Sequence, residues 1–454
     1  MMSMDTLSCF KAYDIRGKVP EQLNGDIAYN IGRALVAELK GDCYVVGYDM
    51  RLESPVIANA LIRGITDAGA DVIDIGLCGT EEVYFATSHY QVSGGVMVTA
   101  SHNPKGYNGM KLVRQESRPI SGDTGLLAIK ARILEERYEA VGISPGKVSS
   151  RPDKTAYLQH LLGYVDCTAL KPLKILANPG NGAAGPVIAA LQKSLPFEWV
   201  VINAEPDGHF PHGVPNPLLP ENRDLTQEAL RAHGCDLALA WDGDFDRCFF
   251  FDGNGRFIEG YYLVALLAQS LLKKNPGSKI IHDPRLTWNT IETVRRAGGD
   301  AVQCKTGHAF IKERMRAEDA IYGGEMSAHH YFREFFYCDS GMIPWLLVCA
   351  LISESGNSLA ELVDAYIAEF PCSGEINYQV ADVAGTVKRI REHFSLAALS
   401  IDETDGVSIE FAQWRLNVRG SNTEPLLRLN IETRADESLL QQKIVELETL
   451  ILES

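Results

Sequence analysis

The sequence has few of the features that mark secreted, nucleic-acid-binding or membrane-spanning proteins. Its ten cysteines include no Cys-x-x-Cys pair and no regular spacing, so neither a disulfide framework nor a zinc ribbon is expected. Basic residues are outnumbered, 43 Lys plus Arg against 59 Asp plus Glu, and the net charge of −16 argues against nucleic acid as a partner. The longest apolar runs, residues 261–272 and 342–352, are too short to cross a bilayer. The first ten residues lack a basic start followed by an apolar stretch, so we expect a cytoplasmic protein with no membrane partner.

The length and composition are those of a folded chain with several domains. At roughly 100–200 residues per domain, 454 residues predict three domains, or four if one of them is small. Hydrophobic residues make up 46% and charged residues 22%, which excludes extended disorder. The acidic total is compatible with a small anionic substrate, because such a substrate responds to local charge.

Short apolar runs alternate with longer helix-periodic stretches over most of the chain, a pattern typical of parallel sheets covered by helices. We predict strands at residues 43–48, 71–75, 95–99, 173–177, 279–282 and 320–322. Helices are predicted over residues 51–69, with Ser54 as the cap and Pro55 in the first turn, and over residues 151–166.

The end of the chain has a different pattern. Apolar and polar residues alternate from Trp414 to Val418 and from Leu427 to Ile431, which predicts an antiparallel pair, and residues 437–452 follow as a helix. The chain is therefore predicted to form three similar α/β domains with mixed sheets and a smaller C-terminal α+β domain. The predicted boundaries are 1–148, 149–252, 253–368 and 369–454.

Three of the predicted strands run directly into polar loops, after Val98, Ala240 and Tyr322. Ligands of open α/β sheets bind at the carboxyl ends of strands, so we expect the chemistry in these loops.

The first loop, residues 99–111, places the hydroxyl of Ser101 beside His102 and ten residues before Lys111. A serine that carries a phosphoryl group needs an exposed hydroxyl and a nearby proton acceptor or donor. Lys111 fits that need if burial or neighbouring cations lower its pKa. The alternative is a Gly/Pro/Asn-rich turn with Ser101 as a local cap.

The second loop presents Asp242, Asp244 and Asp246 at alternate positions, so that their carboxylates can converge on one hard cation. A calcium EF-hand is excluded because the sixth position is Arg247 and the twelfth is Gly253. Three carboxylates suit magnesium, whose remaining sites hold water or phosphate oxygens. The alternative is a solvated acidic turn.

Two further loops carry polar groups suited to a sugar phosphate. Residues 323–330 offer Glu325, Ser327 and a His pair for gripping sugar hydroxyls, with Lys305 and His308 nearby; a tight turn or a structural His pair is the alternative. Residues 419–425 combine an arginine with hydroxyl and amide side chains, which predicts a phosphate-binding nest rather than a plain hairpin turn.

Residues 180–185 match the Gly-x-Gly-x-x-Gly pattern of dinucleotide-binding proteins, and Glu205 lies twenty residues beyond. That reading leaves the aspartate cluster and the loop at 419–425 without a role. We therefore prefer a structural strand-to-helix turn.

Together, the loops at 99–111, 242–247, 323–330 and 419–425 resemble those of the α-D-phosphohexomutase superfamily, and residues 324–330 resemble the bacterial phosphomannomutase and phosphomannomutase/phosphoglucomutase branch. The resemblance extends from residues 13–17 to the C-terminal hairpin. It implies four domains around a central cleft. Two positions depart from relatives: Ala328 stands where they often have Gly, and Arg285 where some carry Lys.

The resemblance implies a role for each residue of these loops. Ser101 would be the phosphorylated serine, and its phosphate would bind magnesium together with Asp242, Asp244 and Asp246. Further implied roles are charge stabilisation by Arg16 and Arg247, general acid–base catalysis by Lys111 and His308, sugar binding by Arg285, Glu325, Ser327 and His329, and binding of the non-reacting phosphate by Arg419, Ser421, Asn422 and Thr423.

The activity implied is the reversible conversion of mannose 6-phosphate to mannose 1-phosphate through a phosphoserine enzyme, with a hexose 1,6-bisphosphate as intermediate and activator. It would feed GDP-mannose and surface polysaccharide synthesis. The implied partners are small sugar phosphates, and we expect a monomer or a weak dimer. Because mannose and glucose differ only at carbon 2, contacts to the 3- and 4-hydroxyls leave a dual phosphomannomutase/phosphoglucomutase as the alternative.

Two other hypotheses remain open. An aspartyl-phosphate phosphotransferase would use Asp242 as nucleophile, although Asp246 stands where such enzymes have Thr or Val. A sugar-phosphate binding protein without catalysis is the other, and a turnover assay separates it from an enzyme.

Overall fold

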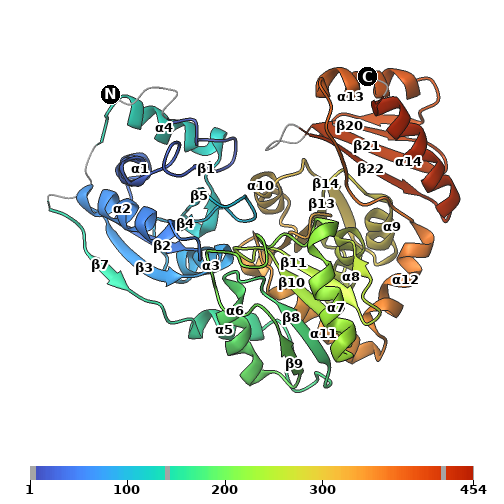
Figure 1. Cartoon of the computed structure of the whole chain (residues 1–454), viewed down its shortest axis with the longest axis horizontal. Helices are drawn as coiled ribbons and strands as arrows, with labels where there is room; N and C mark the ends of the chain where they lie inside the picture. Colours follow the sequence, from blue (N-terminus) through green and yellow to red (C-terminus); the bar gives the residue numbers. More distant parts are fainter. Residues whose placement is uncertain (1–6, 139–143, 421–425, 453–454) are drawn as a thin grey trace. The chain divides into compact units, whose positions relative to one another are not determined.

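The computed structural model describes residues 7–138, 144–420 and 426–452 (Figure 1). The chain divides into two compact units. The first unit comprises Met1–Phe257 and Tyr331–Gly356, and the second unit comprises Ile258–His330 and Asn357–Ser454. Each unit has its own hydrophobic core.

The first unit begins with a seven-stranded mixed sheet. Its elements are β1 (Ile15–Lys18), α1 (Gly25–Leu39), β2 (Cys43–Tyr48), α2 (Ser54–Asp67), β3 (Asp71–Leu77), α3 (Thr80–His89), β4 (Gly94–Val98), β5 (Tyr107–Arg114), β6 (Arg118–Pro119), α4 (Leu126–Leu134) and β7 (Val148–Ser150). The strand order is β1-β5-β4-β2-β3-β7, with β6 beside β5. β2 is parallel to β3 and β4, whereas β5 is antiparallel to β1 and β4. Apolar residues of the strands and of α1, α2 and α4 form one core.

The predicted strands at 43–48, 71–75 and 95–99 correspond to β2, β3 and β4. The helix predicted over residues 51–69 is shorter, because α2 begins at Ser54 and ends at Asp67. Ser54 is not its cap: Glu53 holds that position, and the Ser54 hydroxyl instead donates to Asp49 Oδ1 at 2.6 Å. The Ser54 oxygen accepts from Asn108 Nδ2 at 2.8 Å, whereas a capping serine would accept from a backbone N–H of the first turn.

A second, five-stranded sheet follows in the same unit. Its elements are α5 (Thr155–Leu162), β8 (Lys174–Asn178), α6 (Ala184–Leu191), β9 (Glu198–Val201), α7 (Asp224–His233), β10 (Leu237–Trp241), β11 (Cys248–Asp252) and β12 (Phe257–Ile258). The order is β12-β11-β10-β8-β9. β10 is buried along its whole length because it lies between parallel β8 and antiparallel β11, which explains its unbroken apolar sequence.

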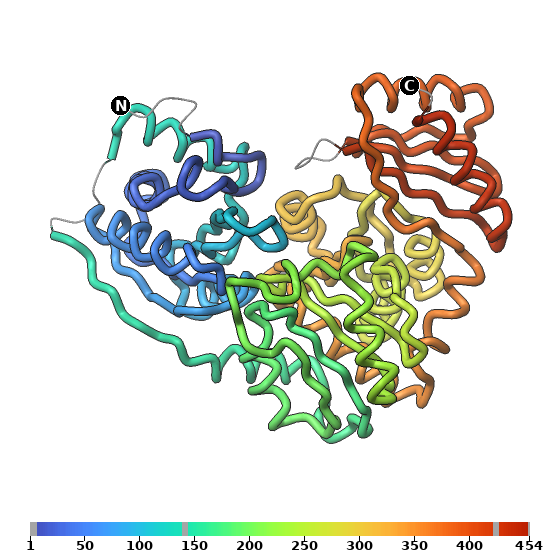
Figure 2. The backbone as a smooth tube through the Cα atoms, in the orientation of Figure 1, coloured from blue at the N-terminus to red at the C-terminus, as the bar shows by residue number. Residues whose placement is uncertain are grey.

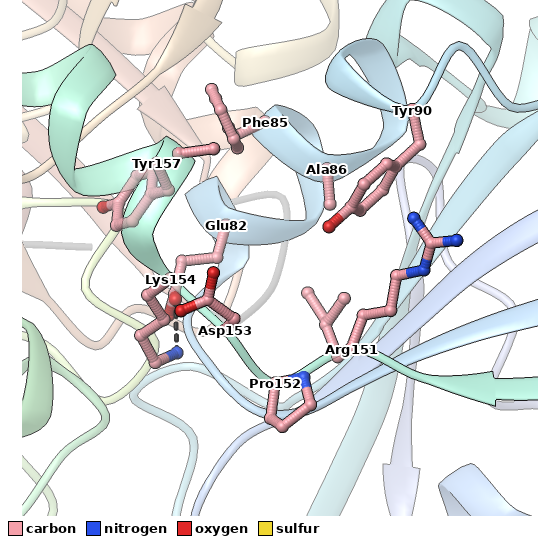
Figure 3. Close-up of a pocket in the computed structure, with 11 residues that line it drawn as sticks. Glu82, Phe85, Ala86, Tyr90, Arg151, Pro152, Asp153, Lys154 and Tyr157 are labelled. Carbon is pink, nitrogen blue, oxygen red and sulfur yellow. Dashed lines mark hydrogen bonds and ion pairs between the residues drawn. The ribbon is translucent and has the colours of Figure 1, made fainter.

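The helix predicted over residues 151–166 is α5 alone, from Thr155 to Leu162. Pro152 and the residues beside it form an extended connection, since a proline cannot donate within a helix. This connection and α3 line a shallow pocket in which Lys154 is ion-paired with Glu82 (Figure 3). Arg151 lies over the ring of Tyr90, 5.0 Å from its centroid. The connection is therefore held against α3 by charge.

Residues 331–356 complete the first unit. β17 (Cys338–Asp339) is antiparallel to β16 (His330–Phe332), and α11 (Ile343–Ser355) follows. Trp345 of α11 packs edge-on against Trp199, and Trp241 Nε1 donates to Gly341 O at 2.9 Å. Within the described residues no single helix is long and apolar enough to span a bilayer; α11 passes that test only when joined to α12 (Leu359–Glu369).

The second unit begins with parallel strands. Its first elements are α8 (Gly260–Lys274), β13 (Lys279–His282), α9 (Trp288–Arg296), β14 (Asp300–Gln303), α10 (His308–Glu318) and β15 (Tyr322–Gly324), and β13 is parallel to both β14 and β15. The strand predicted at 320–322 starts only at its last residue. Asp319 ends α10 in the left-handed conformation, and Ala320 N bonds back to Met315 O, so the chain turns before the strand begins.

The second unit ends in an antiparallel sheet, traced in Figure 2. Its elements are β18 (Ile376–Tyr378), α13 (Val383–Phe394), β19 (Ser400–Asp402), β20 (Val407–Glu410), β21 (Trp414–Gly420), β22 (Leu427–Thr433) and α14 (Glu437–Leu452), in the strand order β18-β22-β21-β20-β19. The predicted pair β21–β22 and the predicted helix 437–452 are confirmed. The polar face of β21 is buried as well: Arg415, Asn417 and Arg419 are at most 4% exposed.

The predicted fold class is confirmed: α/β segments with mixed sheets are followed by a smaller α+β segment. β7 pairs with β3, so residues 148–150 belong to the first sheet. The loops that were predicted to carry the functional residues follow β4, β10 and β15.

Candidate functional site

Arg51 shapes the loop that carries Ser101. Its guanidinium donates to the backbone oxygens of Ser101 (2.8 Å), Asn103 (2.6 Å), Pro104 (3.0 Å) and Tyr107 (3.0 Å). Because one rigid group presents all these donors, the loop is held as a unit. Arg51 was not among the predicted site residues, although it follows β2 just as the predicted residues follow other strands.

The Ser101 hydroxyl points to the aspartate loop. Ser101 Oγ donates to Asp242 Oδ2 at 3.0 Å and lies 3.1 Å from His102 Nδ1. The backbone φ of Ser101 is 49°, a left-handed conformation that costs about 1–3 kcal/mol for a residue other than glycine. The residue is 3% exposed, so the expectation of an exposed hydroxyl is wrong. A buried hydroxyl in a strained turn, aimed at a carboxylate, suits a functional group better than a surface cap.

Asp242, Asp244 and Asp246 converge as predicted. One carboxylate oxygen from each lies within 4.8 Å of the others, and all three residues are buried. Asp242 and Asp244 each use only Oδ2 for hydrogen bonds; their Oδ1 atoms are buried and have no donor among the described residues. Buried carboxylate oxygens without donors are costly unless a cation satisfies them. The cluster therefore fits a hard divalent cation such as magnesium.

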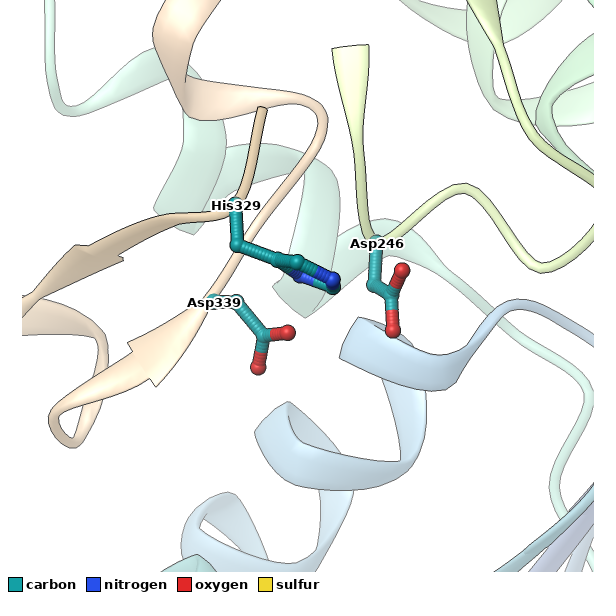
Figure 4. A group of neighbouring side chains, drawn as sticks. All are labelled: Asp246, His329 and Asp339. Carbon is teal, nitrogen blue, oxygen red and sulfur yellow. The ribbon is translucent and has the colours of Figure 1, made fainter. Parts of the chain in front are cut away.

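Lys111 occupies the other side of these carboxylates. Its Nζ lies 2.8 Å from Asp244 Oδ2 and also pairs with the carboxylate of Asp246. Figure 4 shows Asp246 and, near it, Asp339 of β17. Burial alone lowers the pKa of Lys111, but the carboxylates of Asp244 and Asp246 outweigh burial and raise that pKa above its ordinary value. The expectation of a lowered pKa is therefore wrong in this arrangement, and Lys111 is a fixed cation.

Two arginines flank the serine loop. Arg16 is 2.7 Å from Asp14, donates to Ala100 O at 2.9 Å and bonds to the side chain of Asn103. Arg247 donates to Asp242 Oδ2 from both Nε (2.9 Å) and Nη2 (2.7 Å). The structure thus brings both predicted arginines to the loop that carries the serine.

His102 lies between Ser101 and Arg247. Its Nδ1 accepts a hydrogen bond from Arg247 Nη2. Burial, and then the charges of Arg247 and Arg16, hold the pKa of His102 well below its ordinary value. His102 is therefore neutral, and adds no charge beside the serine.

Thr80 was missed by the sequence analysis. Its hydroxyl donates to Asp244 Oδ2 at 2.6 Å and its backbone N–H donates to Asp244 O at 3.0 Å. Thr80 begins α3, directly after β3, so its strand-end position was a signal. It fixes the orientation of one carboxylate of the cluster.

The glycines at 180–185 serve backbone packing. A Cβ on Gly185 would lie 1.8 Å from Ala204 O, and one on Gly182 would lie 3.0 Å from Gly243 O, beside the aspartate loop. Glycine is required at these close approaches whether or not a ligand binds. The geometry supports the structural interpretation of this motif.

In the second unit, Arg285 is the centre of a buried cluster. Arg285 Nη2 donates to Asp283 Oδ2 at 2.7 Å and to Ser327 Oγ at 3.1 Å, and lies 3.5 Å from Glu325 Oε1. Burial raises the pKa of Asp283, but the charge of Arg285 more than offsets it, so the pKa lies below its ordinary value. The structure brings together the predicted residues Arg285, Glu325 and Ser327.

The predicted histidines flank Glu325. Gly307 N, just before His308 at the start of α10, donates to Glu325 Oε1 at 3.1 Å. His329 closes a tight turn, because its carbonyl accepts from Glu325 N at 2.9 Å. Ala328 within this turn has a φ of 70°, which explains why a glycine suits the position.

Arg419 lies at the end of β21, and its guanidinium is 4% exposed. Its nearest anionic groups are Glu375 Oε2 at 3.6 Å and Asp405 Oδ2 at 4.0 Å. The neighbouring predicted residues Ser421, Asn422 and Thr423 lie outside the described residues. Glu375 and Arg428, which pair at 3.3 Å, were missed because no strand-end pattern marks them.

The two units thus carry different chemistry. The cluster around Ser101 combines a hydroxyl, three carboxylates and fixed cations, which suits phosphoryl transfer assisted by a metal. The cluster around Arg285 and Arg419 combines guanidinium groups with hydrogen-bonding side chains, which suits a sugar phosphate.

Comparisons with known proteins agree with this chemistry. Sequence models of the phosphoglucomutase/phosphomannomutase family match four segments: alpha/beta/alpha domain I at residues 8–140, domain II at 155–255, domain III at 259–370 and the C-terminal domain at 375–448.

Individual relatives span the whole chain. Phosphohexose mutases of Xanthomonas campestris pv. campestris are 60% identical over 446 residues, which cover 98% of this chain and 99% of theirs. A phosphomannomutase of Salmonella montevideo is 56% identical over 459 residues, 99% of this chain and 100% of its own. The crystal structure of a phosphoglucomutase/phosphomannomutase family protein from Burkholderia thailandensis has a TM-score of 0.87 at 31% identity, covering 100% of this chain and 98% of that one.

Proposed function

The chain belongs to the phosphoglucomutase/phosphomannomutase family, and we propose that it is an isomerase that interconverts mannose 6-phosphate and mannose 1-phosphate. The observation that carries the proposal is the hydrogen bond from Ser101 Oγ to Asp242, at the edge of a cluster of three buried aspartates. A serine held there can carry a phosphoryl group next to a metal site.

The reaction proceeds by two transfers at Ser101. The bond between Ser101 Oγ and phosphorus breaks as the free sugar hydroxyl bonds to that phosphorus and loses its proton; Ser101 Oγ takes up a proton, and a hexose 1,6-bisphosphate is left. The other phosphorus of this intermediate then bonds to Ser101 Oγ, which loses its proton, as the bond from that phosphorus to the sugar oxygen breaks. The sugar oxygen takes up a proton, and the second hexose phosphate is released with the phosphoserine restored. The low exposure of Ser101 keeps water away from the phosphoserine.

Asp242, Asp244, Asp246 and a phosphoserine oxygen would hold magnesium, which supplies charge stabilisation to the transferring phosphoryl group. Thr80 orients Asp244 for this role. Arg16 and Arg247 lie at the serine loop and offset the charge that spreads over the phosphoryl oxygens. Lys111 contributes a further positive charge; its predicted general acid–base role, and that of His308, stay predictions.

The sugar phosphate would bind through residues of the second unit. Glu325 and Ser327, with His329 adjacent, suit the sugar hydroxyls, and Arg285 holds Ser327 in place. Arg419, together with Ser421, Asn422 and Thr423, would bind the phosphate that does not react. A buried guanidinium is well suited to that phosphate because its fork geometry matches two phosphate oxygens.

We expect mannose to be preferred and glucose to be turned over detectably, because contacts to the 3- and 4-hydroxyls do not distinguish the two sugars. Comparing kcat/KM for mannose 1-phosphate and glucose 1-phosphate measures the preference. A complete absence of glucose turnover would mean that another residue senses carbon 2. The product would supply GDP-mannose and surface polysaccharide synthesis in the cytoplasm.

Intact-mass measurement tests the mechanism directly. We expect one added phosphate on the purified protein, located at Ser101, resistant to hydroxylamine, and absent from Ser101→Ala. The control Ser395→Ala changes an exposed serine and should keep the phosphate. A hydroxylamine-labile phosphate would instead favour an aspartyl nucleophile, and a protein without turnover would favour the binding-protein hypothesis.

A further inference from the structure

Two glutamates of the second unit, Glu432 and Glu375, have side chains that are at most 7% exposed and are held in different ways. Glu432 accepts hydrogen bonds from Thr287 N at 2.7 Å, from Arg415 at 2.8 Å, from Trp288 N at 3.2 Å and from the hydroxyl of Tyr261. The donors of these hydrogen bonds come from four different residues. Glu432 is therefore a fixed part of the fold, because removing it would leave several buried donors without an acceptor.

Glu375, just before β18, is surrounded by three guanidinium groups at longer distances. Its Oε2 lies 3.4 Å from Arg285 Nη1 and 3.6 Å from Arg419 Nη2, and its Oε1 lies 3.3 Å from Arg428 Nη1. Of these three contacts, the one from Arg285 is a hydrogen bond. Well-formed pairs between arginine and a carboxylate are bidentate at about 2.7–2.9 Å, so the contacts of Glu375 are loose.

Arg419 has the least complete set of contacts in this cluster. Its guanidinium donates no hydrogen bond within the described ranges 144–420 and 426–452, and its Nε is buried without an acceptor there. Burial, and then the charge of Arg285, lower the pKa of Arg419. A buried guanidinium with unused donors is suited to an anion that brings more oxygens than one carboxylate does.

Each of the other acids of the cluster, Asp283, Glu325 and Asp405, pairs with one of these arginines. Asp283 is 2.7 Å from Arg285, and Glu325 accepts from Gly307 N at 3.1 Å. Asp405 approaches Arg419 only to 4.0 Å. Glu375 is therefore the one described carboxylate that contacts all three arginines, Arg285, Arg419 and Arg428.

We propose that Glu375 is a displaceable occupant of the phosphate subsite: its carboxylate pairs with Arg285, Arg419 and Arg428 in the free protein and competes with the non-reacting phosphate of the substrate for these arginines. This inference rests on the proposed function. A phosphate dianion offers two charges and several oxygens, so it can replace a single loosely held carboxylate. The competition weakens phosphate binding and thereby favours release of product and reorientation of the bisphosphate intermediate.

Glu375→Gln tests the proposal, because the amide keeps the shape of the side chain and removes its charge. We expect inorganic phosphate and mannose 1-phosphate to bind about 5- to 30-fold more tightly in calorimetry, the range given by loss of one partly buried charge pair. KM should fall with the dissociation constant, and kcat should not rise. The matched control is Glu403→Gln, which removes an exposed carboxylate paired with Arg391 in the same segment and should leave both affinities unchanged.

A double-variant cycle locates the effect. The gain in phosphate affinity should become smaller when Glu375→Gln is combined with Arg419→Ala, because Arg419 is one of the three guanidinium groups for which the carboxylate competes. A gain that is undiminished without Arg419, or an affinity that is unchanged or weaker in Glu375→Gln, overturns the proposal and makes Glu375 a residue that merely positions the arginines. If Glu375→Gln does not fold, Glu375→Asp withdraws the charge from the arginines and should tighten phosphate binding by a smaller factor.

The outcomes separate this inference from the proposed function. A wild-type protein that converts mannose 1-phosphate while Glu375→Gln shows no gain contradicts only the role of Glu375. A wild-type protein that neither binds nor converts mannose 1-phosphate contradicts the proposed function, and the inference falls with it.

Discussion

The cluster around Ser101 and the cluster around Glu375 are both buried and rich in charge, but they differ in how completely their groups are bonded. In the first, Arg51 makes four hydrogen bonds and Asp244 accepts from Thr80 and Lys111 at 2.8 Å or less. In the second, the contacts between Glu375 and its three arginines are 3.3–3.6 Å long. Groups that must stay in place during covalent chemistry are tightly bonded, whereas groups that bind and release a ligand are not.

The largest effect should come from breaking the first cluster at its hydroxyl. Ser101→Ala removes the group that carries the phosphate, so kcat should fall by about 10,000-fold or more while sugar phosphate still binds the second unit. A coupled turnover assay and calorimetry measure the two quantities. Substantial remaining turnover would contradict the phosphoserine mechanism.

Asp244→Asn should have the next largest effect. It removes one carboxylate of the cluster and the partner of both Lys111 and Thr80, and kcat should fall by about 100- to 1,000-fold. Calorimetry with magnesium should show weaker binding. Asp207→Asn, an exposed carboxylate, is the control; equal loss in both variants would argue against a specific metal site.

Arg419→Ala should break the second cluster only. Because Arg419 would bind whichever phosphate is not reacting, in each of the two transfers, KM for mannose 1-phosphate should rise by about 10- to 100-fold with little change in kcat. Arg419→Lys should recover part of the affinity, since it restores charge without the fork geometry. Steady-state kinetics measure both. A fall in kcat at unchanged KM would place Arg419 in the chemical step instead.

Arg51→Lys should loosen the first cluster without changing a reacting group. Lysine cannot reach all four carbonyl oxygens of the serine loop, so the free energy of unfolding should fall by about 1–3 kcal/mol and kcat should fall with it. Urea unfolding checks the stability, with Arg231→Lys on an exposed helix face as control. An unchanged kcat would show that the loop does not need this preorganisation.

The last prediction concerns stability alone and involves Glu81, next to Thr80. It accepts from Tyr157 (2.6 Å), Ser340 (2.8 Å) and Gly341 N (2.6 Å), and burial raises its pKa from 4.5 to about 8. A carboxyl whose pKa is raised on folding stabilises the protein fully below pH 4.5, and this contribution is lost as the pH rises toward 8. The slope is at most about 1.4 kcal/mol per pH unit.

The measurement is the difference between the wild type and Glu81→Gln in unfolding free energy from pH 4.5 to 8.5. The wild type should lose stability relative to the variant as the pH rises. A constant difference across this range would show that Glu81 titrates at its ordinary pKa, held there by its hydrogen-bond donors.

Sequence patterns predicted those parts of the site that lie on one short segment. Asp242, Asp244 and Asp246 could be found because three carboxylates within five residues at a strand end share one local geometry. Ser101 could be found because its loop follows an apolar strand. The partners of Arg51, Thr80 and Glu375 could not be predicted, although Arg51 and Thr80 follow strands, because those partners lie up to 56, 164 and 90 positions away.

The wrong expectations have a common cause. Whether Lys111 gains or loses a proton depends on which charges surround it, and the two aspartates that raise its pKa are 133 and 135 residues away. Likewise, the exposure of Ser101 depends on what covers its loop. Periodicity cannot predict either property, because it reports only on neighbouring residues.

The sequence by itself determined the alternation of strands and helices, the antiparallel pair near the C-terminus, the aspartate triplet and the loops that identify the family, since each depends on residues close together in the chain. Only the tertiary structure decided which cations face those aspartates, which arginine holds the serine loop and which glutamate lies among the arginines. The reason is physical: burial and electrostatic contact act through space, and the groups that set the charge of this site come from segments far apart in the chain.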